Sequence, residues 1–371
     1  MNIVGIVAEY NPFHAGHCHQ IAQTRLTLGE DWTVVVAMSG NFVQRGDCAI
    51  CDKWSRTRAA LEGGADLVLE LPTVWAASSA EHFAFGAVSL LQMAGASALS
   101  FGSEGGDGGQ LSAAAAVLDS PPFREALRRY LDQGLPFALC RHRAAEEILG
   151  VEGAACLGRP NDNLGVEYLR AAARLEFHPR VVAIPRVGAE HDGGAHPAYP
   201  SASHIRGEIL RGEQPMDNPA SLFYNERGVL ARLRSMEVEE LECLPDSGEG
   251  LAIRLHRAAR QATGLEGLYE LTKTRRYAHA RIRRMVLWAW LGLKEQHRPA
   301  SPPYLRVLGC TARGRELLRH LSAEVPVITR PAQGKGVELL EREARCTDLY
   351  ALCRKLPQPA GAEWTTSPII V

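Results

Sequence analysis

The chain begins, after Met1, with Asn2-Ile-Val-Gly-Ile-Val-Ala-Glu-Tyr-Asn-Pro-Phe-His-Ala-Gly-His17, and this segment decides its fold. The apolar run at residues 3–7 predicts a strand that is buried on both faces of a parallel sheet. Asn11 and Pro12 end that strand. Residues 17–28 are expected to form an amphipathic helix, with Ile21, Ala22, Leu26 and Leu28 available for its apolar side. The sequence therefore predicts a strand, a tight turn and a helix whose first turn carries two histidines.

The paired histidines of this turn predict an anion site. Free N–H groups and the positive end of the helix dipole attract phosphate. The imidazoles of His14 and His17 can also donate hydrogen bonds to oxygens of a transition state. Gly16 has no side chain, so a flat base can approach the backbone there. The alternative is that both histidines only cap the helix, and the segment alone leaves it open.

Further apolar runs predict four more buried strands, at residues 33–38, 66–71, 98–101 and 180–184. Helical patterns at residues 52–62 and 79–93 separate them. Strands that alternate with helices of this length form parallel βαβ units, so we expect an α/β fold with a doubly wound parallel sheet. Ligands of such sheets bind at the carboxyl ends of the strands.

Polar and glycine residues follow several of these strands. The loop 39–46 contains Asn41 between two glycines and is expected to face a ligand. Lys53 and Arg56 either bind a phosphate or carboxylate, or lie in the solvated first turn of a helix that Asp52 caps. Gly102 would let a purine ring approach the backbone.

The segment Ser201-Ala-Ser-His-Ile-Arg206 predicts a second phosphate site. Two hydroxyls at a helix N-terminus, with an arginine one turn on, can hold phosphate oxygens. The alternative is a plain serine N-cap. The preceding loop carries His191, Asp192 and His196, but their spacing matches no standard metal site, so we expect a lid and no metal ligands there.

Length and composition bound the class of protein. A chain of 371 residues favours two domains, which we place at 1–215 (α/β, catalytic) and 216–371 (mainly helical, without strands). No apolar stretch reaches ~18 residues, so no membrane span is expected, and no signal peptide is apparent. The nine cysteines are scattered, and the lone Cys48–Cys51 pair lacks the second pair of a zinc site. We expect a reducing cytoplasm.

A basic segment stands out in the second domain, because the net charge of the whole chain is only −1. Residues 273–284 hold six cations and no acid: Lys273, Arg275, Arg276, Arg281, Arg283 and Arg284. On an amphipathic helix, with Tyr277 among them, they are expected to contact a nucleic-acid backbone. The alternative is that they pair with the acidic segment 237–242.

The two histidine and serine motifs, in this order, resemble those of the HIGH-type nucleotidyltransferase superfamily. The likeness is closer to one bacterial family, the tRNA(Met) cytidine acetate ligases. It rests on residues 5–14, 38–46, 52–54, 64–72, 101–104, 160–161, 164–168, 201–206 and 273–284. Ala15 fills a variable position of the motif, whereas Cys48 and the glycine-rich segment around Asp192 depart from the family pattern.

The resemblance implies a reaction in two steps. Acetate and ATP give acetyl-adenylate and pyrophosphate, and the N4 amine of the wobble cytidine of elongator tRNA(Met) then takes the acetyl group. The resemblance implies catalytic roles for His14, His17, Ser201, Ser203 and Arg206. It implies ATP contacts for Val7, Ala8, Glu9, Tyr10, Asn11, Pro12, Phe13, His14, Ala15, Gly16, His17, Cys18, His19, Gln20, Gly102, Asn161, Arg186 and Val187. Mg²⁺ is expected to accompany ATP without an all-protein cage.

Two other functions remain open from the sequence. An adenylyltransferase with a phosphate-bearing small-molecule acceptor would share both motifs but would not need the basic segment. A non-catalytic RNA-binding protein would need only the fold. Acetate-dependent pyrophosphate exchange separates these alternatives from an acetate ligase. Asn161 is ambiguous in the same way, because a helix cap also explains an asparagine after Arg159-Pro160.

Overall fold

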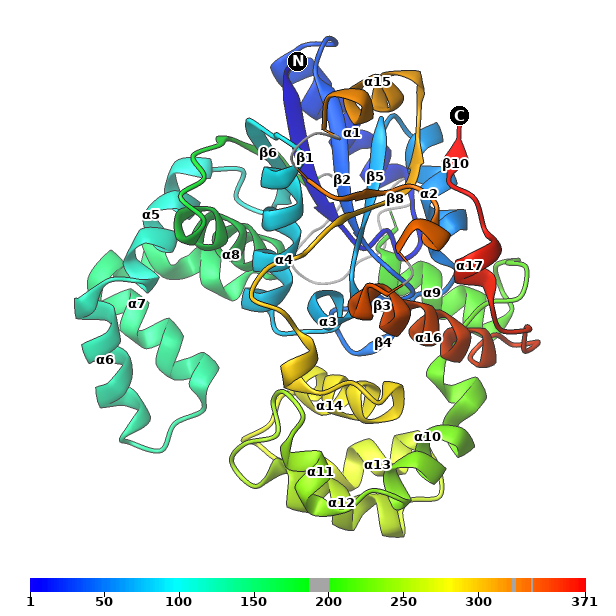
Figure 1. The fold of residues 1–371 in the computed structure, drawn as a ribbon. Helices are drawn as coiled ribbons and strands as arrows, with labels where there is room; N and C mark the ends of the chain where they lie inside the picture. Colours follow the sequence, from blue (N-terminus) through cyan, green and yellow to red (C-terminus); the bar gives the residue numbers. More distant parts are fainter. Residues whose placement is uncertain (187–199, 322–324, 335) are drawn as a thin grey trace.

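The computed structural model describes residues 1–186, 200–321, 325–334 and 336–371, and it is built on one mainly parallel sheet (Figure 1). The strand order is β10-β8-β5-β2-β1-β6-β7, and β9 pairs with β8. The strands are β1 (Ile3–Ala8), β2 (Thr33–Ser39), β5 (Leu67–Leu71), β6 (Ala98–Ser103), β7 (Arg180–Pro185), β8 (Leu305–Cys310), β9 (Val327–Ile328) and β10 (Ile369–Ile370). A short hairpin of β3 (Phe42–Val43) and β4 (Asp47–Cys48) stands apart from them. The predicted doubly wound α/β fold is confirmed.

The sheet reverses its direction of growth at β1. From β1 the chain adds β2 and then β5 on one side, and it adds β6 and β7 on the other. In register, Val4 of β1 lies beside Val34 of β2 and Ala98 of β6. A crevice at the carboxyl ends of the strands forms where the order reverses. The turn after β1 and the end of β6 therefore meet at the place where such sheets bind ligands.

Helices cover both faces of the sheet, and each face has its own apolar cluster. One cluster joins Val4 and Val36 to Ile21 of α1 and Leu61 of α2. The other joins the opposite side chains of the strands to α4 and α8. The helices are α1 (Ala15–Leu28), α2 (Lys53–Glu62), α3 (Thr73–Ala76), α4 (Ala80–Met93), α5 (Gly108–Leu118), α6 (Pro121–Leu131), α7 (Phe137–Ala154), α8 (Pro160–Arg174) and α9 (Ala202–Arg211).

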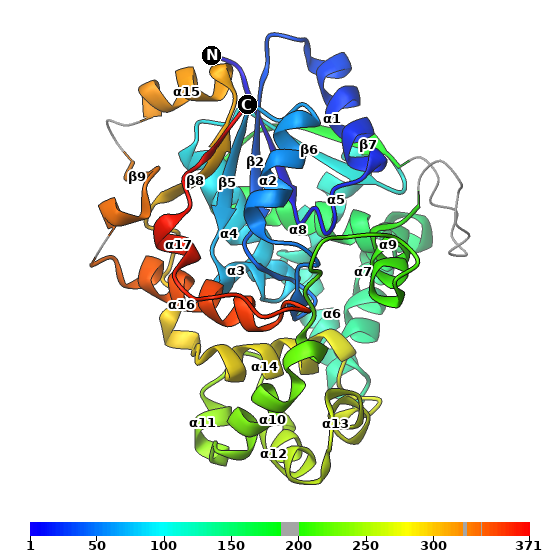
Figure 2. The same cartoon turned by 90° about the vertical axis from the view of Figure 1, so that its right-hand side faces the viewer.

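A helical unit lies below the carboxyl end of the sheet in both views (Figures 1 and 2). It consists of α10 (Glu226–Arg234), α11 (Val238–Glu242), α12 (Leu251–Gln261), α13 (Leu265–Thr272) and α14 (His279–Leu291). The indole N–H of Trp288 in α14 donates to the carbonyl of Ala77 at 2.6 Å. Gly46 of the hairpin has φ +76°, and a Cβ there would lie 2.3 Å from the nitrogen of Arg284. The hairpin therefore packs directly against the backbone of α14.

The last part of the chain returns to the sheet, so the expectation that strands are absent after Met216 is wrong. Strand β8 pairs antiparallel with β5, and β10 adds to β8. Helices α15 (Ala312–Leu321), α16 (Glu338–Leu352) and α17 (Ala362–Thr365) flank this edge. Arg306 interrupts the apolar run of β8 in the sequence, and its charge is matched only by Glu363, far along the chain, among the described residues. Because the partner of Arg306 is distant in the sequence, the local pattern does not predict strand β8.

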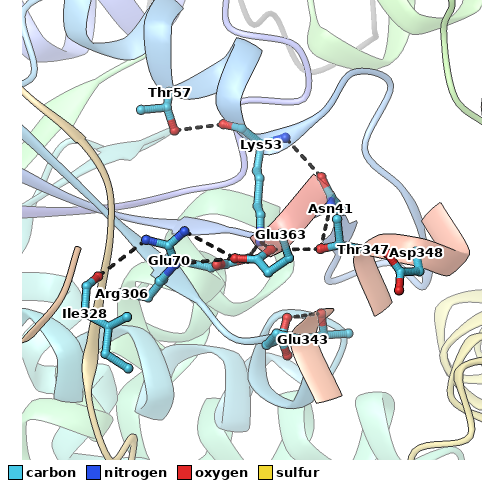
Figure 3. Close-up of polar contacts among 12 residues, drawn as sticks. Asn41, Lys53, Thr57, Glu70, Arg306, Ile328, Glu343, Thr347, Asp348 and Glu363 are labelled. Carbon is cyan, nitrogen blue, oxygen red and sulfur yellow. Dashed lines mark hydrogen bonds and ion pairs between the residues drawn. The ribbon is translucent and has the colours of Figure 1, made fainter. Parts of the chain in front are cut away.

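A buried ionic network attaches this returning segment to the core (Figure 3). Lys53 Nζ lies 2.5 Å from Glu70 and also contacts Glu363, and neither Lys53 nor Glu363 has exposed surface. Arg306 reaches the same Glu363 at 3.3 Å. The network thus joins the start of α2 and the end of β5 to β8 and α17. Lys53 is neither a ligand-facing cation nor a solvated one, so both predicted roles are wrong.

Asn41 belongs to the same interior, which corrects the expectation that its loop faces a ligand with this side chain. The Lys53 N–H donates to Asn41 Oδ1 at 3.0 Å. The Asn41 amide donates in turn to the Thr347 hydroxyl at 3.3 Å.

No helix in the described part of the chain combines the length and the apolar character that a membrane crossing needs.

Lys53→Met should destabilise the fold strongly. The change leaves Glu70 and Glu363 buried with one cation fewer, and breaking a buried ion pair costs about 3–5 kcal/mol. Equilibrium urea unfolding measures the difference. Arg129→Met serves as the control, because the Arg129–Glu147 pair is exposed and its loss should cost less than about 1 kcal/mol. Equal losses in the two variants would contradict the role of the network.

Candidate active site

The turn between β1 and α1 is held in shape by buried side chains. Tyr10 has a positive φ of 49°, and its ring packs against Phe13 and His17 at centroid distances of 4.8 and 4.7 Å. The Asn11 side chain accepts a hydrogen bond from the N–H of Ile50 at 2.7 Å. The side chains of Tyr10 and Asn11 therefore fix the path of the turn and leave its backbone to face the crevice.

His14 and His17 are fixed by hydrogen bonds from the backbone. The N–H of Gly16 donates to Nδ1 of His14 at 3.1 Å. The N–H of His14 donates to Nδ1 of His17 at 3.2 Å. The two rings stack at 3.8 Å. Because each Nδ1 accepts a hydrogen bond, the proton of each neutral ring must sit on Nε2. Both imidazoles thus keep an Nε2–H to donate to an anion.

The electrostatic setting keeps both rings neutral. Burial, aided by the positive charge of Arg186, lowers the pKa of His14 from 6.5 to about 4. Burial also lowers the pKa of His17 well below its usual value, with His14 and Arg186 adding to the effect. The capping alternative therefore accounts for Nδ1 of each ring, and it assigns no role to Nε2.

Gly16 is required by this arrangement for a steric reason. A Cβ at this position would lie 2.9 Å from Cε1 and 3.1 Å from Nδ1 of His14. Any side chain would push the His14 ring off its N–H donor. The glycine between the two histidines is therefore explained by the cap geometry, before any base contact is considered.

Arg206 joins the second motif to this turn. Its Nη1 donates to the carbonyl of Asn11 at 2.6 Å, and its Nη2 donates to the Ser203 hydroxyl at 3.1 Å. Ser201 is the N-cap of α9 and accepts from the N–H of His204, as the capping alternative for that residue expects. Ser203 is exposed beside the arginine. The predicted histidine and serine segments are thus brought together.

Arg186 joins the end of β6 to the same place. Its Nη1 donates to Oδ1 of Asn161 at 3.2 Å, and its side chain lies 3.5 Å from a Cβ built at Gly102. Asn161 also donates to Glu104, at 2.5 Å. Asn161 therefore links α8 to two charged residues and does not cap the helix, whose N-cap is Arg159. Gly102, Asn161 and Arg186 form one group beside the histidines.

Two carboxylates that sequence reasoning did not single out position this group. Glu104 accepts from the N–H groups of Asn161 and Asp162. Asp162 is buried and accepts from the Ser103 hydroxyl at 2.5 Å and from the Glu104 N–H at 2.8 Å. The two side chains lock the N-terminus of α8 to the end of β6. In the sequence, the position of Glu104 directly after the predicted strand was the signal that could have indicated this contact.

Arg56 is a third positioning residue, and it is buried rather than exposed to a ligand or to solvent as predicted. Its guanidinium donates to the carbonyl oxygens of Glu9 at 2.7 Å, Ser39 at 3.0 Å and Cys51 at 3.1 Å, and also to that of Gly40. These carbonyls lie after β1, at the end of β2 and before α2. One cation therefore fixes three loops that border the crevice.

Comparison with known proteins identifies the family of this chain. A model of the HIGH Nucleotidyl Transferase family matches residues 1–363. The chain belongs to the HIGH nucleotidyl transferase family. The tRNA(Met) cytidine acetate ligases of Syntrophomonas wolfei and of Thermoanaerobacter sp. are each 34% identical to it. Those alignments cover 100% and 98% of this chain, and 99% and 98% of the relatives. The resemblance found in the sequence is therefore confirmed.

Solved structures of the same family superpose over the full length. TmcAL of Thermotoga maritima bound with alpha-thio ATP gives a TM-score of 0.91 at 28% identity, with 100% of each chain covered. The apo form of that protein gives 0.93 at 30% identity, with the same coverage. The Thermotoga maritima protein is thus a relative that binds an ATP analogue.

Other predicted residues of the family site are placed as follows. Ala15 and Cys18 are exposed on α1, whereas Pro12 is buried. Val187 and the loop residues His191, Asp192 and His196 lie outside the described residues. Among the residues that are described, no three His, Cys, Asp or Glu side chains gather in a way that could hold a metal ion.

The basic segment is only partly helical. Residues 273–278 form the connection before α14, and Lys273 Nζ donates to the carbonyls of Thr274 and Tyr277 within it. The three arginines of α14 form ion pairs: Arg281 with Glu249, Arg283 with Asp47 and Arg284 with Asp246. None of these acids belongs to the 237–242 segment named by the alternative. Arg275 and Arg276 are exposed.

His14 should titrate far below an ordinary histidine. We expect its Cε1–H signal in the NMR spectrum of the native protein to show no inflection near pH 6.5, because its pKa lies at about 4. In the unfolded chain His14 binds a proton as pH falls through about 6.5, whereas in the folded chain it binds one only near pH 4. The free energy of unfolding therefore decreases as pH falls below about 6.5. The same signal in the urea-unfolded protein, where the inflection should lie near 6.5, is the control. An inflection of His14 near 6.5 would contradict the neutral, Nε2-protonated pair.

Proposed function

We propose that this protein is an ATP-dependent acetate ligase that forms N4-acetylcytidine at the wobble position of elongator tRNA(Met). One observation carries the proposal: two neutral imidazoles and the Ser203–Arg206 pair meet at the turn after β1. The relatives that share the whole length of the chain are named for this reaction. The first step joins acetate to the α-phosphate of ATP and releases pyrophosphate. The second transfers the acetyl group to the cytidine amine.

The geometry suits the first step. Attack of the acetate carboxylate on the α-phosphate builds negative charge on the phosphoryl oxygens, and donors fixed in advance stabilise such charge. We assign that role to the Nε2–H groups of His14 and His17. Ser201, Ser203 and Arg206 would hold the departing pyrophosphate at the start of α9. Gly102, Asn161 and Arg186 would contact the nucleotide from the end of β6.

Further parts of the proposal concern the co-substrate and the partner. Mg²⁺ would enter with ATP, held by phosphate oxygens and water, as this ion prefers. The tRNA would contact the basic segment, where Arg275 and Arg276 are exposed. Arg281, Arg283 and Arg284 would have to exchange their present carboxylate partners for phosphates, and Lys273 would shape the connection. A reaction that consumes tRNA and ATP places the protein in the cytoplasm.

Exchange of labelled pyrophosphate into ATP tests the first step. We expect exchange that depends on acetate and needs no tRNA or coenzyme A. His14→Ala and His17→Ala should each lower its rate by about 10²–10³, the usual loss when one fixed transition-state donor is removed. His178→Ala changes an exposed histidine and should leave the rate unaltered. His14→Asn keeps an acceptor for the Gly16 N–H and should retain the fold, which melting temperature verifies.

Other outcomes identify the other functions. Exchange that requires a phosphate-bearing acceptor and ignores acetate would make the protein an adenylyltransferase. Binding of tRNA with no exchange under any condition would leave an RNA-binding protein without this chemistry. Acetylation of transcribed tRNA(Met) with labelled acetate and ATP, in the absence of coenzyme A, tests the second step.

A further inference from the structure

A groove of about 490 Å³ lies on the helical unit, between α12 and the connection from α13 to α14. The residues that argue for its use are Ile253, Arg254, Arg257, Gln261, Leu271 and Tyr277. No carboxylate lines it among the described residues. Tyr277 is the one described lining residue that belongs to the 273–284 segment; the other lining residues precede that segment.

The walls of the groove are basic. Helix α12 reads Leu-Ala-Ile-Arg-Leu-His-Arg-Ala-Ala-Arg-Gln, with three arginines, one histidine and no acid. Arg254 donates to the carbonyls of Leu271 and Thr272 at the end of α13, which fixes its guanidinium at the rim. Arg257 is exposed, and within the described structure it forms no ion pair. This differs from α14, where every arginine faces a carboxylate.

Apolar residues line the groove together with these cations. Ile253 and Leu271 are 42% and 41% exposed. Tyr277 also lines the groove, with its hydroxyl donating to the carbonyl of Glu249 at 2.6 Å. The adjoining connection presents exposed Arg275 and Arg276. Apolar or aromatic surface beside arginines is the combination that receives an unstacked base together with its phosphate.

We propose that this groove binds one unpaired nucleotide of the RNA substrate, with the base on Ile253 and Leu271 and the phosphate on Arg257. The absence of carboxylates among the described lining residues favours a polyanion, and the exposed apolar surface of Ile253 and Leu271 favours a base over a bare phosphate. The inference rests on the proposed function for the identity of the RNA. It adds a binding site on α12, which the sequence did not indicate because its three arginines are spread over a helical repeat of apolar residues.

Affinity for tRNA(Met) at several salt concentrations tests the charge of the site. Arg257→Glu should weaken binding about tenfold and reduce the salt dependence by about one phosphate contact. Arg128→Glu is the matched control, because Arg128 is an exposed arginine on α6 with the same charge change. Equal weakening by both variants would show a general effect of charge and would overturn the proposal.

Ile253→Ser tests the apolar part of the groove. The substitution removes apolar surface for the base without changing charge, so it should weaken tRNA binding by about tenfold with an unchanged salt dependence. Wild-type affinity in this variant, or in Arg257→Glu, would overturn the assignment. Acetate-dependent pyrophosphate exchange without tRNA should be normal in both variants. If the wild-type protein showed no such exchange, the proposed ligase activity would be wrong. The tRNA affinities would still show whether the groove binds RNA.

Discussion

The hydrogen bond from the Arg206 guanidinium to the carbonyl of Asn11 is the contact on which the site depends. It connects residues 195 positions apart in the sequence. On one side stands a turn whose histidines are held by backbone N–H groups, and on the other a helix N-terminus with two serines. Under the proposed function, neither part alone would hold a triphosphate. Their union at the carboxyl end of β1 is what makes this end of the sheet a candidate catalytic centre.

Buried cations shape the rest of that end. Lys53 and Arg56 lie one turn apart at the start of α2, and both are withdrawn from solvent. Lys53 meets carboxylates from the end of β5 and from α17, whereas Arg56 donates to backbone carbonyls of three loops. A guanidinium suits the second task because its donors spread in a plane. These buried cations thus fix the loops around the crevice. The proposed ligand-binding residues therefore do not have to hold the loops in place.

The sequence predicts the parallel strands and the helices between them, because continuous apolar runs and helical periodicity are local signals. It also predicts which segments meet, since the carboxyl ends of parallel strands share one edge. It fails where a partner is remote. Arg306 masks β8 until Glu363 is placed beside it, and Lys53 looks like a surface cation until two carboxylates enclose it. The ion pairs of α14 depend on acids at positions 47, 246 and 249, which no local pattern connects to the helix.

A crystal structure of this protein with a non-hydrolysable ATP analogue tests the central claim most directly. The account predicts that Nε2 of His14 and of His17 lie within hydrogen-bond distance of the phosphates, and that Ser203 and Arg206 contact the outer phosphates of the same molecule. The Arg206–Asn11 contact should persist. A triphosphate that touches the histidines but lies out of reach of α9, or that binds at another edge of the sheet, would contradict it.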